Sequence, residues 1–226
     1  MSSDAMPVMS RPETLRGHVE SFLREAIMNG RFAPGERLVE RELCEMLKVS
    51  RPPLREALRK LEAEKLIVIV PHRGPVVASL DIAEARELYA LRGLLEGFAA
   101  HEFARLASDK EIVKLGKAVN NLHKQSSNPD RRALIEAKSK IYDVLLGCCG
   151  NRLITEVLQG LLSRINLLRA TSFSRPERLR ESLAEIDELL ACIKNRDGEG
   201  AQRMATLHIK NAENAALEVL ESSTER

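Results

Sequence analysis

The sequence predicts a mainly α-helical protein of two domains, in which three helices and a β-hairpin precede an all-helical bundle. Apolar residues recur at three- and four-residue steps along most of the 226-residue chain, which is the period of a buried helix face. The β-branched runs that indicate strands are confined to residues 66–79. Aromatic residues make up only 3% of the chain and Trp is absent, so aliphatic side chains must fill the cores.

The first domain is predicted to cover residues 11–79, after an unpatterned segment at residues 1–10 that we expect to be a disordered tail. Residues 13–29 predict a helix that stops at Gly30. Its apolar face is formed by Leu15, Val19, Phe22, Leu23, Ala26 and Ile27. A Pro-Gly turn then leads to Leu38, which we expect to be buried, and to a short helix at residues 39–47. The inward side chains of that helix are predicted to be Val39, Leu43, Met46 and Leu47.

Residues 49–67 predict a third helix, built to lie against a nucleic acid. Ser50 is a good N-cap, because its hydroxyl can accept a bond from a first-turn N–H, and Pro52 and Pro53 fit a first turn. The stripe expected to be buried is Leu54, Ala57, Leu58 and Leu61, and the basic stripe beside it is Arg51, Arg55 and Arg59. The planar arginine fork can bond a phosphate, or the O6 and N7 of guanine. The alternative is an ordinary solvated amphipathic helix.

The two helices at 39–47 and 49–67 are joined so tightly that they match a helix-turn-helix, whose second helix enters the major groove. Strands expected at residues 66–70 and 76–79 would form a hairpin, or wing, directly after that helix. Its tip carries His72 and Arg73, which could reach a phosphate or the minor groove; the alternative is an ordinary exposed turn. A small basic surplus supports nucleic-acid contact weakly, since residues 11–79 hold 13 Lys and Arg against 10 Asp and Glu.

The run PGERLVERELCEMLKVSRPPLREALRKLEAEKLI, followed by PHRG, resembles the N-terminal winged helix of GntR-family transcription regulators. The resemblance implies DNA contacts from Arg41, Ser50, Arg51, Pro53 and Arg55, and from the wing. Arg51 and Arg55 are also chosen by helix geometry, whereas Arg41 rests on the resemblance alone. Relatives often have Thr at the position of Pro52, so a possible hydroxyl contact is absent here.

The second domain, residues 80–226, is predicted to be all-helical, with helices at residues 82–107, 109–125, 130–149, 152–171, 176–195 and 198–222. Asp81 and Asp109 are expected to cap the first two. The inward side chains expected in the first are Leu88, Leu91, Leu95 and Ala99. The pieces Glu87…Arg92…Glu96, Gly150-Asn151 and Arg196-Asp197…His208 resemble the FCD domain of the FadR-like branch of the family. The resemblance implies an effector-binding and dimerisation domain.

Many FCD domains bind a divalent metal through an Asp and a His one turn apart and two later His residues. Here the first three positions are Lys138, Tyr142 and Ile186, and only His208 remains, so we expect no metal. Lys138 could supply the positive charge instead and hold a small organic acid together with Arg92, Tyr142 and His208. The alternative is a collapsed pocket in which Ile186 packs against its neighbours and Lys138 reaches solvent.

These features predict a ligand-responsive transcription regulator that binds a palindromic double-stranded DNA operator as a homodimer. A second hypothesis is a winged-helix protein that has lost ligand binding and acts as a constitutive DNA-binding protein or scaffold; a third is contact with protein or RNA. We expect a repressor, although the residues do not distinguish repression from activation. An enzyme is not expected, because the chain has no nucleophile elbow, phosphate-binding glycine loop or HExxH motif. We expect no cofactor, four reduced and mostly buried cysteines, no membrane association and a cytoplasmic location.

Overall fold

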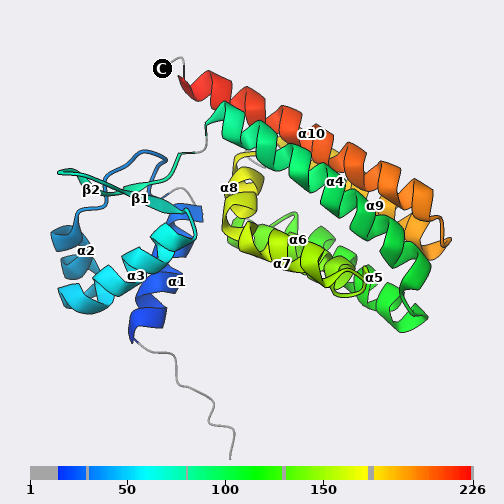
Figure 1. Cartoon of the computed structure of the whole chain (residues 1–226), viewed down its shortest axis with the longest axis horizontal. Helices are drawn as coiled ribbons and strands as arrows, with labels where there is room; N and C mark the ends of the chain where they lie inside the picture. Colours follow the sequence, from blue (N-terminus) through cyan, green and yellow to red (C-terminus); the bar gives the residue numbers. More distant parts are fainter. Residues whose placement is uncertain (1–14, 29–30, 80, 129–130, 173–175, 225–226) are drawn as a thin grey trace, which may run out of the picture. The chain divides into compact units, whose positions relative to one another are not determined.

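The computed structural model describes residues 15–28, 31–79, 81–128, 131–172 and 176–224. Figure 1 follows the chain through these segments from the N-terminal helix in blue to the C-terminal helix in red. The chain divides between Ala78 and Ser79 into two compact units, each of which is described by itself. The tail predicted at residues 1–10 and the helix stop expected at Gly30 lie outside the described residues.

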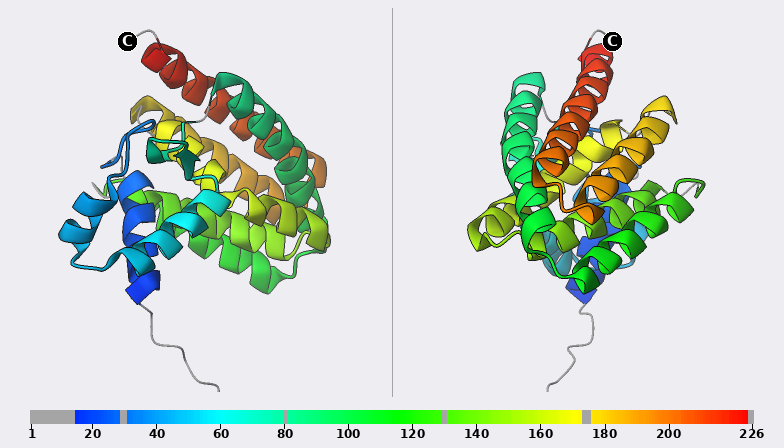
Figure 2. Two further views of the ribbon diagram at one scale, coloured as in Figure 1. Left: turned by 60° about the vertical axis from the view of Figure 1, so that its left-hand side comes forward. Right: turned by 90° about the vertical axis from the view of Figure 1, so that its right-hand side faces the viewer.

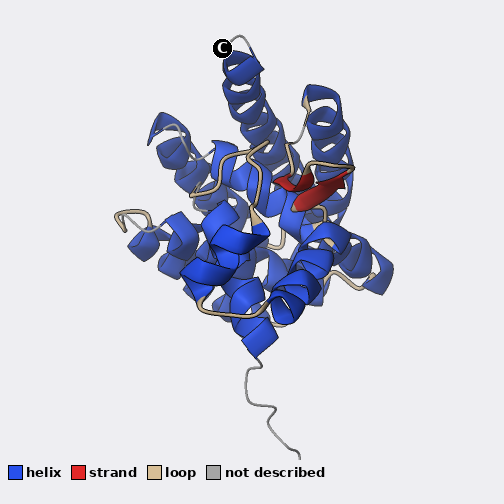
Figure 3. Ribbon diagram, turned by 90° about the vertical axis from the view of Figure 1, so that its left-hand side faces the viewer, coloured by secondary structure: helices blue, strands red, loops and turns tan. Residues whose placement is uncertain are grey.

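The first unit contains three helices and a hairpin: α1 (Leu15–Met28), α2 (Glu40–Leu47), α3 (Arg51–Ala63), β1 (Ile67–Val70) and β2 (Gly74–Val77). The two strands pair antiparallel, with Ile67 opposite Val77, and they are the red arrows of Figure 3. The loop before α2 joins them, because Leu38 N–H donates to the Pro75 carbonyl at 2.8 Å. This winged helix-turn-helix is the predicted fold class of the first domain.

Side chains from all three helices and from the hairpin form one apolar core in this unit. Its buried members are Val19, Leu23, Ala26, Ile27, Phe32, Leu38, Leu43, Leu54, Ala57, Leu58, Leu61, Leu66, Ile67 and Val77. The predicted buried stripe of α3 and the buried Leu38 are therefore confirmed. Leu15 and Met46 were expected inside but are exposed, because Leu15 begins α1 beyond the core and Met46 lies on the outer face of α2, where its sulfur contacts Arg31.

Helix α3 is shorter than the predicted 49–67. It begins after Ser50, which holds the N-cap position, but the Ser50 hydroxyl makes no capping hydrogen bond. It ends because Lys65 adopts a left-handed conformation (φ 60°), and Leu66 N–H bonds back to the Leu61 carbonyl at 2.9 Å. This is a Schellman arrangement, which ends a helix and satisfies its last carbonyls. Leu66 and Ile67 thus leave the helix and turn into the wing.

The described residues of the second unit form seven helices: α4 (Ile82–Leu106), α5 (Asp109–Gln125), α6 (Arg131–Gly147), α7 (Arg152–Gly160), α8 (Leu162–Ser172), α9 (Pro176–Lys194) and α10 (Gly198–Thr224). The two longest, α4 and α10, pack along one another and stay adjacent in both views of Figure 2. None of the helices in the described residues is both long and apolar enough to cross a membrane.

Three expectations for this unit need correction. A single helix at 152–171 was expected, but the chain turns at Leu161 after Gly160, a residue with poor helix propensity. The N-cap of α5 is Ser108 rather than Asp109: its hydroxyl accepts from Glu111 N–H, and Glu111 bonds back to Ser108 N–H. Leu91 is exposed rather than inward. Asp81 caps α4 as expected, by accepting from Glu84 N–H at 2.6 Å.

All four cysteines carry free thiols, but only Cys149 is buried; Cys44, Cys148 and Cys192 are half-buried, fewer buried than expected. The Cys148 thiol donates to a Glu111 carboxylate oxygen at 2.8 Å. Burial and this bond raise the pKa of Cys148 to about 11. That thiol is therefore a poor nucleophile at neutral pH.

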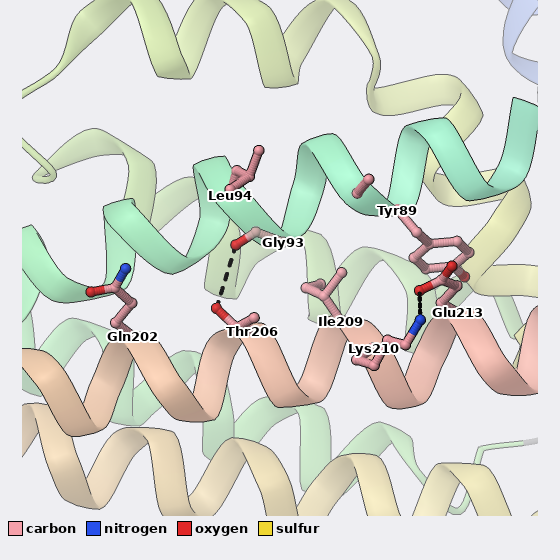
Figure 4. A pocket seen from close by; sticks show the side chains of 9 residues that line it. Tyr89, Gly93, Leu94, Gln202, Thr206, Ile209, Lys210 and Glu213 are labelled. Carbon is pink, nitrogen blue, oxygen red and sulfur yellow. Dashed lines mark hydrogen bonds and ion pairs between the residues drawn. The ribbon is translucent and has the colours of Figure 1, made fainter.

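Of the two α4 glycines that face α10, Gly97 lies closer to it than Gly93. A methyl group added there would lie 2.7 Å from Thr206 Oγ1, whereas one added at Gly93 would meet Ile209 Cγ2 at 3.9 Å. Figure 4 shows Gly93 facing Thr206, whose hydroxyl donates to the Gly93 carbonyl at 3.5 Å. Beside this contact runs an open groove of about 460 Å³, lined in part by Tyr89, Leu94 and Gln202.

We predict that Gly97→Ala destabilises the second unit by about 1–2 kcal/mol, because the stiff Thr206 side chain must move. Gly93→Ala is the matched control and should be neutral or stabilising by up to about 1 kcal/mol, since alanine favours a helix. Both tyrosines of the chain, Tyr89 and Tyr142, lie in this unit and there is no Trp. Tyrosine fluorescence during urea unfolding therefore reports on this unit; equal stabilities for the two variants would contradict the close crossing.

Candidate functional site

The first candidate surface is the N-terminal half of α3. Arg51 and Arg55 are exposed there, and Pro53 is partly buried in the first turn. Leu54 and Leu58, on the opposite side, are buried in the core of the unit. The helix is thus anchored by one face and offers guanidinium groups from another. Pro52 and Pro53 have no N–H, so the guanidinium groups are the main donors of this helix end.

Helix α2 contributes Arg41, which is exposed, and a carboxylate that contacts α3. Both oxygens of Glu40 accept from Arg55 Nε, at 3.1 and 3.0 Å. This ion pair links the two helices of the helix-turn-helix. It was not predicted from the sequence, because the two residues are 15 positions apart and only the packing of α2 against α3 brings them together.

The wing tip carries His72 and Arg73, both exposed. His72 adopts a left-handed conformation (φ 62°) in the tight turn that closes the hairpin. Arg73 Nη2 donates to the Gly35 carbonyl at 3.3 Å, which ties the tip to the loop before α2. The wing is therefore held against its own unit while both side chains stay accessible.

The second candidate site is a cluster of buried and half-buried charged and polar side chains inside the helical unit, which we call the basic cluster. It comprises Tyr89, Arg92, Glu96, Lys138, Tyr142, Arg169, Arg178, Ser182, Glu185 and His208. These residues come from α4, α6, α8, α9 and α10. The four residues predicted for effector binding, Arg92, Lys138, Tyr142 and His208, all belong to it.

Lys138 lies at the centre of the basic cluster and is only 2% exposed. Its ammonium group donates to Ser182 Oγ at 3.0 Å and lies 2.8 Å from His208 Nε2. The alternative prediction, in which Lys138 reaches solvent, is therefore wrong. Ile186 is buried, as that same alternative expected.

His208 connects Lys138 to a carboxylate. Its Nδ1 lies 2.5 Å from Glu185 Oε2, and Arg178 bonds both Glu185 oxygens at 2.9 and 2.6 Å. The network reaches the surface at an open groove of about 400 Å³ between α9 and α10, where Asn211 also donates to Glu185 at 2.7 Å. A neutral His208 that donates from Nδ1 leaves Nε2 to accept from Lys138, so one tautomer satisfies both contacts.

Two arginines of the basic cluster stack on the two tyrosines. The Arg92 guanidinium lies 5.1 Å from the centre of the Tyr89 ring, and that of Arg169 lies 4.5 Å from the centre of the Tyr142 ring. Arg92 also forms a buried ion pair with Glu96 at 2.7 Å. Among the described residues, Arg92 Nη1 and Tyr89 Oη have no hydrogen-bond partner although both are buried. Such groups call for a ligand or water.

The electrostatics of the basic cluster are those of a positive interior. Burial lowers the pKa of Lys138 well below its usual value, and Arg169, Arg178 and Arg92 lower it further. Burial and the neighbouring Lys138 lower the pKa of His208 to about 3. Burial alone would raise the pKa of Glu185, but hydrogen bonds from His208 and Arg178 bring it down to about 2. The site therefore favours a negative charge and disfavours another positive one.

The basic cluster does not fit a divalent metal. Lys138 occupies His208 Nε2, and the buried Ile186 offers no donor atom. No group of three or more His, Cys, Asp or Glu side chains suited to a metal occurs within the described ranges. Four members that matter here, Arg169, Arg178, Ser182 and Glu185, were not predicted as site residues. Arg178, Ser182 and Glu185 are spaced by four and three residues, which places them on one helix face and could have indicated a shared site.

An exposed arginine-bearing helix in a winged helix-turn-helix, followed by an all-helical unit around buried charges, defines a DNA-binding transcription regulator. Residues 15–77 match the bacterial regulatory proteins of the gntR family, and residues 87–211 match the FCD domain. The chain therefore belongs to the GntR family and carries an FCD domain as its second unit. Regulation of transcription, rather than catalysis, is its function, and the predicted family and class are confirmed.

Individual proteins are similar along nearly the whole chain. The "Uncharacterized HTH-type transcriptional regulator YdhC" of Bacillus subtilis is 28% identical over 204 residues, covering 90% of this chain and 91% of its own. The HTH-type transcriptional repressor RspR of Escherichia coli is 27% identical over 210 residues, 90% of each chain. The solved structure of E. coli McbR/YncC has a TM-score of 0.72 at 21% identity, over 93% of this chain and 99% of that one, which shows the shared fold.

We predict that acid destabilises the helical unit through His208. The pKa of His208 is about 3 when folded and near 6.5 when unfolded. Between these values the unfolded chain binds a proton that the folded chain does not, so stability is lost as pH falls from 6.5 towards 3, by up to about 1.4 kcal/mol per pH unit. Urea unfolding followed by tyrosine fluorescence should show a shallower pH slope in His208→Gln. His123→Gln, at an exposed histidine of the same unit, is the control; equal slopes in wild type and His208→Gln would contradict the prediction.

Proposed function

We propose that this regulator binds a palindromic operator as a homodimer, with contacts from Arg41, Ser50, Arg51, Pro53 and Arg55 and from His72 and Arg73 of the wing. The observation that carries the proposal is the exposure of Arg51 and Arg55 on a helix whose other face is buried. Arginines near the start of a recognition helix reach guanine edges and phosphates. By analogy with the name of RspR, repression is the regulatory outcome that we propose.

The homodimer is proposed to form through the helical unit. Large apolar side chains are exposed on two helices that pack together, α4 and α7: Leu91, Leu94 and Phe98 on α4, and Leu153 and Val157 on α7. Steps of three and four residues place each set on one helix face. Exposed apolar surface of this kind is typical of an interface between subunits. A two-fold dimer would present two copies of α3, which matches a palindrome.

The effector proposed for the basic cluster is a small organic acid, held by Arg92, Lys138, Tyr142 and His208. Three arginines and Lys138 surround two carboxylates, Glu96 and Glu185. A bound carboxylate would accept from Lys138 and from Arg92 Nη1, and its charge would favour the ammonium form of Lys138. One observation favours the constitutive alternative: Lys138 already bonds Ser182 and His208, so the network is partly satisfied without a ligand.

We expect Arg51→Ala and Arg55→Ala each to weaken binding to a duplex selected from a random pool by the wild-type protein. A loss of about 1–3 kcal/mol each is typical of an arginine that reads a base. Each selected duplex should bind two chains of the wild-type protein, with affinity measured by fluorescence anisotropy and stoichiometry by sedimentation. Arg203→Ala, an exposed arginine of α10, is the matched control and should bind as wild type. Folded Arg51 and Arg55 variants that bind as tightly as wild type would refute these contacts.

We expect calorimetry with citrate, succinate and gluconate to detect binding of at least one acid to the wild-type protein. Lys138→Met, which keeps the bulk of the side chain and removes its charge, should weaken that binding by about tenfold or more, as expected for a charged hydrogen bond. Lys140→Met is the matched control, since Lys140 is exposed on the same helix. Unchanged heat in Lys138→Met would remove Lys138 from the site. Absence of binding by every acid would favour the constitutive alternative.

A further inference from the structure

The Glu40–Arg55 ion pair joins the two helices of the helix-turn-helix at the proposed DNA surface. Arg55 Nε donates to both Glu40 oxygens, at 3.1 and 3.0 Å. The Arg55 side chain remains 58% exposed, while Glu40 is 28% exposed. Among the described residues, the hydrogen bonds of Arg55 all run through Nε, and its two terminal amino groups make none.

Glu40 is well placed to act as a fixed support. It is the first residue of α2, and the N-cap residue Val39 has no side chain that could accept a bond from the first turn. A carboxylate in the first turn is stabilised by the partial positive charge of the helix N-terminus. Glu40 is also less exposed than Arg55. The carboxylate is therefore the more enclosed partner, and the arginine is the one that reaches towards solvent.

Because the guanidinium group is rigid, this contact also fixes which edge of Arg55 is presented to a partner. Its five N–H groups lie in one plane as a fork, and the group can bind side-on through Nε and one amino group, or end-on through Nη1 and Nη2. Because Nε is bonded to Glu40, a base or phosphate cannot bind side-on through it. The end-on edge, formed by Nη1 and Nη2, remains available. That edge has the spacing of guanine O6 and N7 in the major groove.

We propose that Glu40 is a positioning residue for DNA recognition, which holds Arg55 through Nε so that only its end-on edge is offered to a base. The inference rests on the proposed contact of Arg55 with DNA. The Glu40 charge has a second effect, since it offsets the attraction of Arg55 for phosphates at every sequence. That effect is equal for every duplex, so Glu40 raises specificity in one way, by aligning Arg55 with a base.

The test compares affinity for two duplexes of equal length and composition, the one selected by the wild-type protein and a scrambled one, by fluorescence anisotropy. Glu40→Ala should bind the scrambled duplex more tightly and the selected one no better, so that the ratio of the two affinities falls about tenfold. Glu40→Gln, which removes the charge and keeps the shape, should lose an intermediate part of the ratio. It also keeps the test open if Glu40→Ala does not fold.

Glu42→Ala is the matched control, because Glu42 lies in the first turn of the same helix and is exposed. It removes the same charge and the same first-turn carboxylate, so it should tighten binding to both duplexes alike and leave the ratio unchanged. A merely electrostatic or helix-stabilising role of Glu40 would give this same pattern. Only a positioning role of Glu40 predicts that its loss lowers the ratio of the selected to the scrambled affinity.

A double-mutant cycle with Arg55→Ala completes the test. If Glu40 acts through Arg55, the Glu40→Ala change should leave the ratio unaltered in the Arg55→Ala background. An unchanged ratio in folded Glu40→Ala, or a full effect without Arg55, overturns the inference. If Arg55→Ala itself binds as wild type, the proposed DNA contact of Arg55 fails first, and that outcome is seen separately from the Glu40 result.

Discussion

Lys138 Nζ and His208 Nε2 lie 2.8 Å apart in the interior of the helical unit, and both side chains are 2% exposed. Two cations at that distance without water would repel strongly, so at least one group must be neutral. A neutral His208 that donates to Glu185 and accepts from Lys138 meets the condition. This one protonation state joins α6, α9 and α10, and it leaves the surrounding arginines to make the interior positive. The preference of this interior for an anion depends on it.

The two units differ in where their functional charged side chains lie. In the first, the charged side chains that matter are exposed, and an aliphatic core fixes the helix that carries them. In the second, the charged side chains are buried, and ion pairs, tyrosine stacking and hydrogen bonds to Ser182 and Glu185 hold them. Exposed guanidinium groups suit a partner that is itself highly charged and hydrated. Buried ones suit a small ligand that can replace water completely.

Sequence patterns predicted the architecture well because it depends on local signals. The leucine spacing of α3, the Pro-Gly turn and the β-branched wing each act over a few residues. The Ser108 cap was missed because Ser108 and Asp109 are both good N-cap residues. The break at Leu161 was missed because a single glycine such as Gly160 is often tolerated inside a helix. The partners of Lys138 could not be predicted: Ser182 and His208 come from helices that only tertiary packing brings to α6. Arg41 was assigned by resemblance, and its exposure is consistent with that assignment without testing it.

The most direct test of the buried network is nitrogen NMR of the histidine side chains in the whole protein, which has only five histidines. Long-range proton–nitrogen spectra distinguish the two neutral tautomers from the imidazolium. The account predicts that His208, assigned by comparison with His208→Gln, is neutral with its proton on Nδ1 at pH 7 and stays so well below the pH at which a hydrated histidine becomes charged. A charged His208 at pH 7, or a proton on Nε2, would contradict it.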